Sequence, residues 1–433
     1  MQTVWYTFAQ PNFFAACRAR FAGYWMIRLP GFPPMVVTTD RDAIRRLFTG
    51  DPLVRRHGND LLMSAFGERS VMMLEPDEHL VRRRLESPPV HGQAVLAYAE
   101  RIRELVGAEV ASWEPGQVVV SHPRARAVTI AIILELVLGI RDADLQTELA
   151  AIFDSFNTPL SKLALFLPTT LGRRAGWNVI AKPAFARVDR MRALLGAHIA
   201  HTRADPTLHE RRDVLALLVR ARDQDGHALS NIDLRDELVT LVAAGHETTA
   251  TAMAWTCDLL AHHPTVVTRL RDTLASGERD YLKATVKELL RVRTIAYVAA
   301  ARQMLEPFPI GDWVLGPEVL ILVDAQGVHG DPQLYPQPQE FRPERFLDAS
   351  HDGYAYIPFG GGAHRCLGAA LATLELELFI ETLVDHTEPV PAGPPARPVR
   401  RGVTLAPGNQ GRMRVTRRSH NNRKHSRQHH RHR

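Results

Sequence analysis

The sequence predicts a mainly α-helical single domain with small β-sheets. Helical periodicity with few interruptions runs from Asp77 to about Ala261, and short β-prone runs lie toward both ends of the chain. No linker divides the chain before residue 418. With 433 residues, 45% of them hydrophobic, the chain can bury one large core. We therefore expect one domain over residues 1–418.

The first elements are predicted to be a helix, a hairpin and a second helix. Residues 11–22 have a helical pattern. The β-prone runs Tyr24–Leu29 and Met35–Thr39 flank the turn-forming residues 30–34. Asp40 then opens a short helix over Asp40–Phe48, because its carboxylate can accept hydrogen bonds from the first free N–H groups.

The middle of the chain is predicted to hold one very long helix, around Ile232–Ala261. Ser230-x-x-Asp233 resembles a capping box at its start, and Pro264 follows its end. At about 1.5 Å per residue such a helix spans roughly 45 Å, enough to cross a whole domain. Strand character returns in three later runs, Trp313–Val323, Val403–Leu405 and Met413–Thr416.

Composition argues against several classes of protein. Three cysteines are too few for a disulfide framework and are typical of a reducing cytosol. We see no signal peptide at the N-terminus and no apolar run long enough to span a membrane. We therefore expect a cytoplasmic protein without a transmembrane anchor.

The last fifteen residues, 419–433, account for most of the net charge of +6, since they hold five Lys or Arg, five His and no acid. We expect this tail to be disordered, and we do not expect a nucleic-acid partner.

Residues 359–368 are the most informative stretch. Glycines 360–362 permit a sharp turn and close approach to a flat ligand, and Gly368 keeps side-chain bulk away from the same face. Cys366 stands at the start of an apolar helical pattern, where free N–H groups favour an anion. A soft, charged ligand on a loop suits haem iron. The alternative for a lone cysteine is a buried, inert thiol.

This stretch resembles the signature F-x-x-G-x-[RH]-x-C-x-G of the cytochrome P450 superfamily of haem-thiolate monooxygenases. The matching residues are Phe359, Gly362, His364, Cys366 and Gly368. The resemblance implies the cytochrome P450 fold, with the long helix crossing over haem b, and Cys366 as the axial iron ligand. The absence of an N-terminal anchor is typical of soluble bacterial members.

The long helix carries Ala244-Gly-His-Glu247-Thr248-Thr249, which resembles the family motif [AG]-G-x-[DE]-T-[TS]. The resemblance implies that Thr248 holds iron-bound dioxygen and that Glu247 feeds a proton relay. Glycine and threonine are poor helix formers, so we expect Gly245 and its neighbours to open a local groove in the helix. An exposed polar helix face is the alternative.

Two further motifs complete the resemblance. Glu288-x-x-Arg291 with Pro343-Glu-Arg345-Phe346 resembles the family's structural ion-pair network, in which Glu288, Arg291 and Arg345 hold the segment under the haem. His79-x-x-x-Arg83 resembles its propionate motif. Buried anions need cationic partners, and the candidates for the haem propionates are His79, Arg83, Arg302 and His364. Arg82 and Arg84 are predicted to lie on a solvated face or a basic docking surface.

The chain departs from the family pattern after Arg293. Family members usually carry prolines there, in a segment that lines the substrate pocket, whereas this chain reads Thr-Ile-Ala-Tyr-Val over 294–298. We expect an apolar pocket lined by four stretches: 61–73, 157–176, 243–244 and 294–298.

The resemblance implies a monooxygenase of EC class 1.14 that inserts one oxygen atom from O₂ into a hydrophobic small molecule. We find no flavin or NAD fingerprint in the chain. We therefore expect a monomer that receives electrons from a ferredoxin or flavodoxin with its NAD(P)H-dependent reductase. Two alternatives remain at this point: a haem-thiolate peroxygenase, dehydratase or isomerase, and a non-catalytic haem sensor. The intact Glu247–Thr248 pair argues against both.

Overall fold

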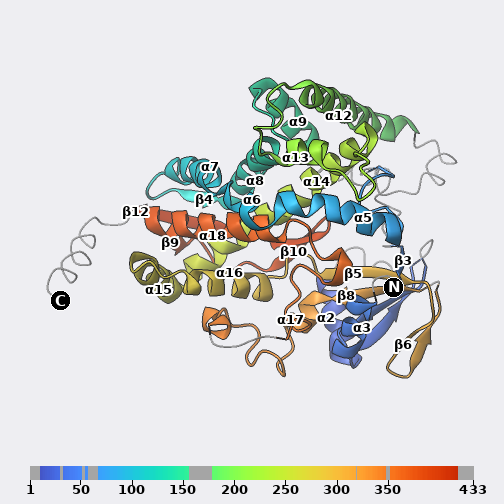
Figure 1. Cartoon of the computed structure of the whole chain (residues 1–433). Coiled ribbons are helices and arrows are strands. Elements are labelled where there is room, and N and C mark those ends of the chain that lie inside the picture. Colours follow the sequence, from blue (N-terminus) through green and yellow to red (C-terminus); the bar gives the residue numbers. More distant parts are fainter. Residues whose placement is uncertain are drawn as a thin grey trace.

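Helices and sheets occupy different regions of the computed structural model (Figure 1). The structure describes residues 10–29, 33–50, 54–56, 67–155, 178–317, 319–347 and 352–417. Most helices gather around the long α14, while a five-stranded sheet lies beside α2 and α3 at the other side of the molecule. The predicted class, mainly α with small sheets in a single domain, is confirmed.

The helical elements follow one another along most of the chain. The α-helices are α2 (Gln10–Arg20), α3 (Arg41–Thr49), α5 (Pro76–Glu86), α6 (Gly92–Leu96), α7 (Ala99–Ala111), α8 (Ser121–Ile132), α9 (Ala143–Ser155), α12 (Asn178–Ala204), α13 (Val214–Arg220), α14 (Asn231–His262), α15 (Pro264–Ala275), α16 (Asp280–Val292), α17 (Ala325–His329) and α18 (Ala369–His386). Shorter turns are η3 (Pro88–Val90), η5 (Pro343–Phe346) and η6 (Gly362–His364), which are 3-10 helices, and η4 (Ile133–Val137), a π-helical turn that continues α8.

Within the described ranges, the strands form four small sheets. They are β1 (Tyr24–Ile27), β2 (Met35–Thr38), β3 (Val54–Arg56), β4 (Val118–Val120), β5 (Val298–Met304), β6 (Phe308–Ile310), β7 (Trp313–Leu315), β8 (Leu320–Asp324), β9 (Thr387–Pro391), β10 (Pro398–Arg401), β11 (Thr404–Pro407) and β12 (Arg412–Arg417). The largest sheet has the order β1-β2-β8-β5-β3, and the others are β4-β12-β9, β10-β11 and β6-β7. β2 and β8 pair in parallel, with Met35 opposite Leu320. The remaining pairs are antiparallel.

The N-terminal elements agree with the sequence prediction. β1 and β2 form the antiparallel hairpin, with Tyr24 opposite Thr38. The Asp40 side chain accepts a 2.7 Å hydrogen bond from the Ala43 N–H and so caps α3. Strand β5 was not predicted, because Val-Ala-Ala-Ala-Arg-Gln-Met has few β-branched or aromatic residues. It forms because it lies between β8 and β3, where neighbouring strands complete its hydrogen bonds.

Helix α14 forms the centre of the core. Its first turn has the predicted capping box, in which Ser230 and Asp233 each bond the other's backbone N–H. Every residue from Ala250 to Ala261 is buried, so this half is covered on all sides. Ala243 and Ala244, in the middle of the same helix, are exposed. An exposed apolar position at the centre of a core helix marks the place where the packing opens.

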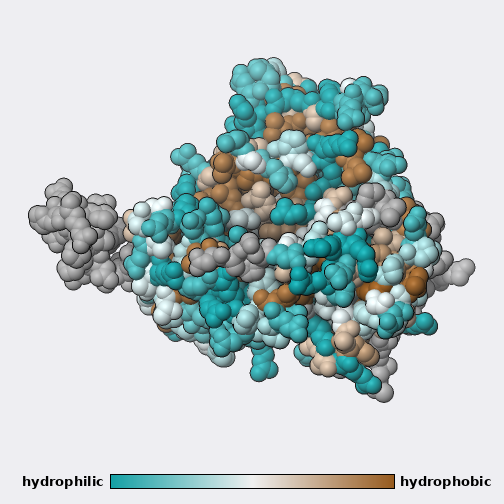
Figure 2. Space-filling view, turned by 60° about the horizontal axis from the view of Figure 1, so that its bottom comes forward, coloured by the Kyte–Doolittle hydropathy of each residue, from teal (hydrophilic) through white to brown (hydrophobic). Residues whose placement is uncertain are grey.

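Among the described residues, no helix is both long enough and apolar enough to cross a membrane. On the face shown in Figure 2, hydrophilic residues predominate, and apolar residues form separate patches between them. The predicted tail, 419–433, lies outside the described residues.

Candidate functional site

The cysteine loop packs against α3 and β5. Cys366 donates its backbone N–H to the Phe359 carbonyl at 2.9 Å, which closes the loop. Gly360 has φ +66°, and a Cβ there would lie 2.7 Å from the Ala299 carbonyl oxygen. A Cβ on Gly361 would meet the Phe48 ring at 2.2 Å. These two glycines are therefore required by close packing behind the loop. A Cβ on Gly368 would meet nothing within 4 Å, so the other side is open.

Cys366 is accessible, whereas the other two cysteines, Cys17 and Cys257, are buried and free. Protein atoms crowd the Cys366 sulfur although it can be reached, and this desolvation raises the pKa of its thiol. A hydrogen bond from the Gly368 backbone N–H and the charges of Arg83 and Arg365 counteract part of that rise. The sequence led us to expect a thiolate at this position, but the place of Cys366 before α18 does not by itself make the sulfur a thiolate. A coordinated cation would, because a metal-bound thiol loses its proton.

The four predicted propionate ligands lie near one another beside this loop. His364 Nδ1 is 2.8 Å from His79 Nε2, a hydrogen bond between η6 and α5. Arg83 donates to the Arg365 carbonyl at 2.8 Å, and it lies close enough to Cys366 for an electrostatic interaction with the sulfur. Burial, and the charges of Arg83 and Arg302, lower the pKa of His79 to about 4. The fold thus brings His79, Arg83, Arg302, His364 and Cys366 into one cluster from α5, β5 and the loop.

The acid–alcohol pair lies on a continuous stretch of α14. Thr248 donates its hydroxyl hydrogen to the Ala244 carbonyl at 2.6 Å, one turn earlier in the helix. A Cβ on Gly245 would lie 2.9 Å from Cδ1 of Ile133 in η4. The groove expected at Gly245 is therefore not present: α14 remains helical there, and Gly245 instead lets η4 approach.

Glu247 is held by two basic side chains that sequence reasoning missed. Its Oε1 lies 3.2 Å from His122 Nε2, and its Oε2 lies 3.0 Å from Arg126 Nε, both on α8. Burial alone would raise the pKa of Glu247, but the His122 hydrogen bond and the nearby positive charges lower it below its ordinary value. His122 and Arg126 precede Glu247 by more than a hundred residues, so only the packing of α8 on α14 reveals the contact.

The predicted ion-pair network is present; we call Glu288, Arg291 and Arg345 the lock. Arg291 donates to both carboxylate oxygens of Glu288, at 2.7 and 2.8 Å, and Arg345 Nε lies 3.3 Å from Glu288 Oε1. Arg291 also donates to the carbonyls of three residues, His329, Pro338 and Glu340. The lock therefore joins α16, α17 and the segment that leads to η5.

His329 extends this lock toward the cysteine loop. Its Nδ1 lies 3.0 Å from Thr294 Oγ1, and its Nε2 accepts the Ile357 N–H at 3.0 Å. Burial, followed by the charge of Arg291, lowers the pKa of His329 to about 3, so it stays neutral and can accept. The sequence motif around His329 indicated the fold but not this contact.

Arg82 is not on a solvated face, contrary to the sequence prediction. It is 5% exposed and pairs with Asp233 at 2.7 Å. Glu86 lies 3.9 Å and Glu237 4.0 Å from the same guanidinium. We call Arg82, Glu86, Asp233 and Glu237 the α5–α14 cluster. The error arose because a run of three arginines on a helix is typical of a solvated surface; Arg84 does lie exposed.

Part of the predicted substrate lining can be located. The segment that lacks the family prolines is fixed by its backbone: Leu405 donates to the Ile295 carbonyl at 2.8 Å, and Ala296 pairs with Thr404. Ala243 and Ala244 are exposed in mid-helix, as a pocket lining requires. The stretch 157–176 and residues 61–66 lie outside the described residues.

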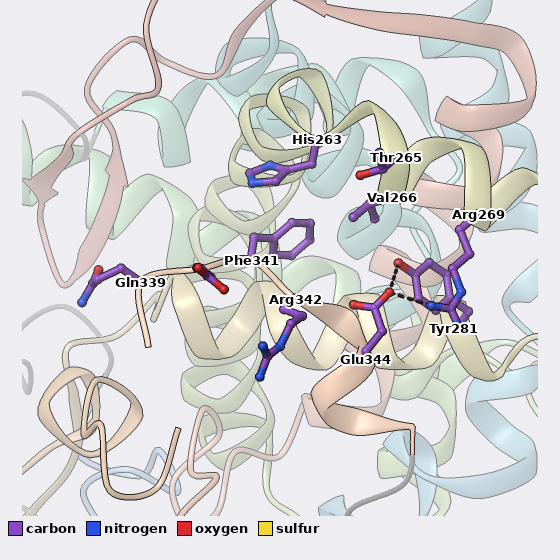
Figure 3. Close-up of a pocket in the computed structure, with 10 residues that line it drawn as sticks. His263, Thr265, Val266, Arg269, Tyr281, Gln339, Phe341, Arg342 and Glu344 are labelled. Carbon is purple, nitrogen blue, oxygen red and sulfur yellow. Dashed lines mark hydrogen bonds and ion pairs between the residues drawn. The ribbon is translucent and has the colours of Figure 1, made fainter. Parts of the chain in front are cut away.

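A separate surface pocket of about 730 Å³ lies between α15, α16 and the segment before η5 (Figure 3). Glu344 accepts from Arg269 at 2.7 Å and from Tyr281 at 2.9 Å at one end of it, and the His263 ring packs edge-on against Phe341. None of the predicted haem or oxygen residues lines this pocket.

The comparisons with known proteins agree with one another. A family model described as "Cytochrome P450" matches residues 3–408. The chain is 34% identical to cytochrome P450 135B1 of Mycobacterium tuberculosis (strain ATCC 25618 / H37Rv) over 415 residues, which cover 93% of this chain and 87% of the relative. It is also 34% identical over 388 residues to cytochrome P450 138 of the same strain, covering 89% and 87%.

Solved structures show the same fold. The chain is similar to a retinoic acid-bound cyanobacterial CYP120A1, with a TM-score of 0.82, 22% identity and 96% of each chain covered. It is also similar to the haem domain of cytochrome P450DA, with a TM-score of 0.81, 21% identity and coverage of 96% and 95%.

Proposed function

Because this chain belongs to the cytochrome P450 family of haem-thiolate monooxygenases, we propose that it inserts one oxygen atom from O₂ into an apolar small molecule, using electrons from a ferredoxin or flavodoxin. The family uses haem iron with an axial cysteine, together with O₂, a substrate and a redox partner. The apolar substrate, the type of electron donor and the cytoplasmic setting are our proposals.

The residues around Cys366 fit a haem. The thiol is accessible, Gly368 leaves open space beside it, and cations from α5 and β5 lie next to the loop. We propose that Cys366 ligates the iron and that Arg83, Arg302, His79 and His364 hold the propionates. Phe359, Gly362 and Gly368 would shape the loop around the sulfur. When bound, the haem supplies O₂ activation, which thiolate donation favours.

The roles of the oxygen side follow from α14. We propose that the Thr248 hydroxyl positions dioxygen and that Glu247 supplies protons, with both residues as catalytic residues. Thr248 now bonds the Ala244 carbonyl, so it can turn between its own backbone and a ligand. Glu247 is ionised and held at α8, so it must gain a proton before it can donate one.

The observation that carries the proposal is the accessible Cys366 thiol in a closed glycine loop among arginines and histidines. The decisive experiment is the carbon monoxide difference spectrum of the reduced protein. We expect the thiolate-type Soret band in the wild type and its loss in Cys366→Ser. A wild type without the band, or a Cys366→Ser variant that keeps it, would overturn the proposal.

Turnover separates oxygen insertion from the alternatives. With a surrogate ferredoxin chain, NADH and ¹⁸O₂, an apolar substrate found by its spin-state shift should yield a product with one ¹⁸O atom. Peroxygenase, dehydratase or isomerase chemistry would leave ¹⁸O₂ unincorporated. A haem sensor would give no NADH-dependent product.

The electron donor is proposed to dock beside the cysteine loop. Arg84 and Arg365 are exposed there, and an acidic partner would be steered toward them; Arg82 is buried and plays no part. Arg84→Glu with Arg365→Glu should slow reduction of the haem by the ferredoxin, most strongly at low salt. Arg414→Glu, an exposed site on β12, is the control. An unchanged rate in the double variant would contradict docking at this face.

A further inference from the structure

His122 is a buried histidine whose two ring nitrogens face groups of opposite charge. It is 1% exposed. Its Nε2 lies 3.2 Å from Glu247 Oε1 and 3.4 Å from Thr251 Oγ1 on α14. Its Nδ1 contacts the Arg401 guanidinium on β10. The backbone of His122 is also fixed, because its N–H donates to the Gln410 carbonyl at 3.1 Å.

These contacts determine the tautomer of His122. A guanidinium has donors but no acceptor, and it does not lose its proton in proteins. Nδ1 of His122 must therefore accept from Arg401 and carry no hydrogen. The single ring hydrogen of the neutral imidazole is then on Nε2, which bonds Thr251 Oγ1 and lies 3.2 Å from Glu247 Oε1, so that this N–H dipole lies beside the carboxylate.

This tautomer has a consequence for proton transfer. To give its Nε2 proton to Glu247, His122 would have to receive another proton at Nδ1. The group at Nδ1 is Arg401, which cannot supply one. His122 can hold the Glu247 carboxylate, but the route through its ring is closed to protons.

The other titratable or charged groups around the carboxylate do not open this route. They are Arg126 on α8, which lies 3.0 Å from Glu247 Oε2 and 2.5 Å from Asp154 on α9, and His246 on α14. Burial, with the charge of Arg126, lowers the pKa of His246 to about 4, so that ring is neutral at physiological pH. Arg126 is again a donor only.

We propose that Arg401 and His122 are positioning residues for Glu247: Arg401 fixes His122 as an Nε2–H donor, which holds the carboxylate and blocks proton entry from the α8 side. Protons for catalysis then reach Glu247 from the side of α14 that carries Thr248. This inference rests on the proposed role of Glu247 in the oxygen reaction.

The first test is independent of turnover. In the diamagnetic, reduced carbon monoxide form of the haem-loaded protein, ¹⁵N-histidine spectra at pH 7 should show one ring with its hydrogen on Nε2 and none on Nδ1. Its signals are assigned by their loss in His122→Phe. Arg401→Met should allow hydrogen to appear on Nδ1, whereas Arg401→Lys, also a donor without an acceptor, should keep Nδ1 without hydrogen. A wild-type His122 ring that carries a hydrogen on Nδ1 would overturn the inference.

The second test measures product formed per NADH consumed against pH. Arg401→Met should give a value higher at pH 6 than at pH 8 by a factor of about two to ten, because Nδ1 of His122 can then take up a proton while Nε2 passes one to Glu247. Adding His122→Phe should remove this dependence, and the wild type and Arg401→Lys should lack it. Arg400→Met, an exposed neighbour that bonds Gly402, is the matched control.

Glu247→Gln separates the two proposals. If it leaves product per NADH unchanged, the proposed role of Glu247 fails, while the histidine spectra still decide the tautomer. If it lowers product per NADH but Arg401→Met has the wild-type pH profile, the blocked route fails and the role of Glu247 stands.

Discussion

Two buried charge clusters described above, the lock and the α5–α14 cluster, differ in how fully their polar atoms are matched. In the lock, both oxygens of Glu288 accept hydrogen bonds from Arg291. The guanidinium of Arg291 also donates to backbone carbonyls. In the α5–α14 cluster, two nearly inaccessible carboxyls, Glu86 and Glu237, face the single guanidinium of Arg82. The matched Glu288–Arg291 pair balances its own charge, whereas the surplus of acid in the α5–α14 cluster must be relieved by a proton.

We assign that proton to Glu86, although burial raises the pKa of both carboxyls. Glu237 accepts the Val71 backbone N–H at 2.9 Å, which favours its ionised form. Burial, and next the charge of Glu237, raise the pKa of Glu86 to about 10. The stability that the lock contributes should therefore depend mainly on whether each partner is present. The stability that the α5–α14 cluster contributes should depend mainly on pH.

The largest effect is expected for Arg291→Met. It leaves the buried Glu288 with only Arg345 and the Arg342 backbone N–H as partners, and it removes donors from three carbonyls. Breaking a buried pair in this way costs about 3–5 kcal/mol of unfolding free energy. Urea denaturation of the haem-loaded protein measures it. Arg269→Met, at an exposed pair with Glu344, is the control and should cost less than about 1 kcal/mol. Equal losses would remove the distinction between the lock and a surface pair.

A smaller loss is expected for Arg82→Met. Asp233 keeps the Ser230 hydroxyl and Arg69 as donors, and the Glu86–Glu237 pair can take up a second proton. We expect a loss of about 1–3 kcal/mol at pH 7. The loss should shrink at pH 5, where protonation relieves the carboxyls. The same denaturation series at both pH values tests this, and a loss at pH 5 as large as that of Arg291→Met would show that the clusters are alike.

The smallest effect is expected for Glu86→Gln, and it should depend on pH. Because the folded-state pKa of Glu86 is raised, its contribution to stability is fully present below the ordinary pKa of 4.5 and is lost as pH rises toward about 10. A neutral glutamine cannot ionise, so it does not destabilise the folded state as pH rises. The variant should match the wild type near pH 5 and exceed it in unfolding free energy at pH 9. Parallel curves would place the proton elsewhere.

Sequence reasoning predicted the features whose chemistry is local. Asp40 and Ser230 cap helices through residues three positions away, and the loop around Cys366 is contiguous, so a short window contains the whole pattern. The Glu288–Arg291 pair is likewise one turn of one helix.

Features that depend on distant packing could not be predicted. The sequence predicts Arg82 to be a surface residue. Only the packing of α5 against α14 shows that it is buried and pairs with Asp233. The contacts of Glu247 with His122, and of His122 with Arg401, join α14, α8 and β10. No spacing in the sequence distinguishes these residues from other polar side chains on helices and strands.

The parallel pairing of β2 with β8 also constrains how the protein is made. β2 cannot pair with β8 until the ribosome has synthesised Leu320, the residue opposite Met35, so the middle of the five-stranded sheet cannot form earlier. At about 5–20 residues per second, a ribosome needs roughly 15–60 seconds to synthesise the intervening chain. During that interval β2 has an unpaired edge that can bind other strands. The β1–β2 hairpin and the capped helix α3 are local and can form early, but β1 covers only the opposite edge of β2. The edge that pairs with β8 stays open until the C-terminal third of the chain emerges, so this sheet is completed only late in synthesis.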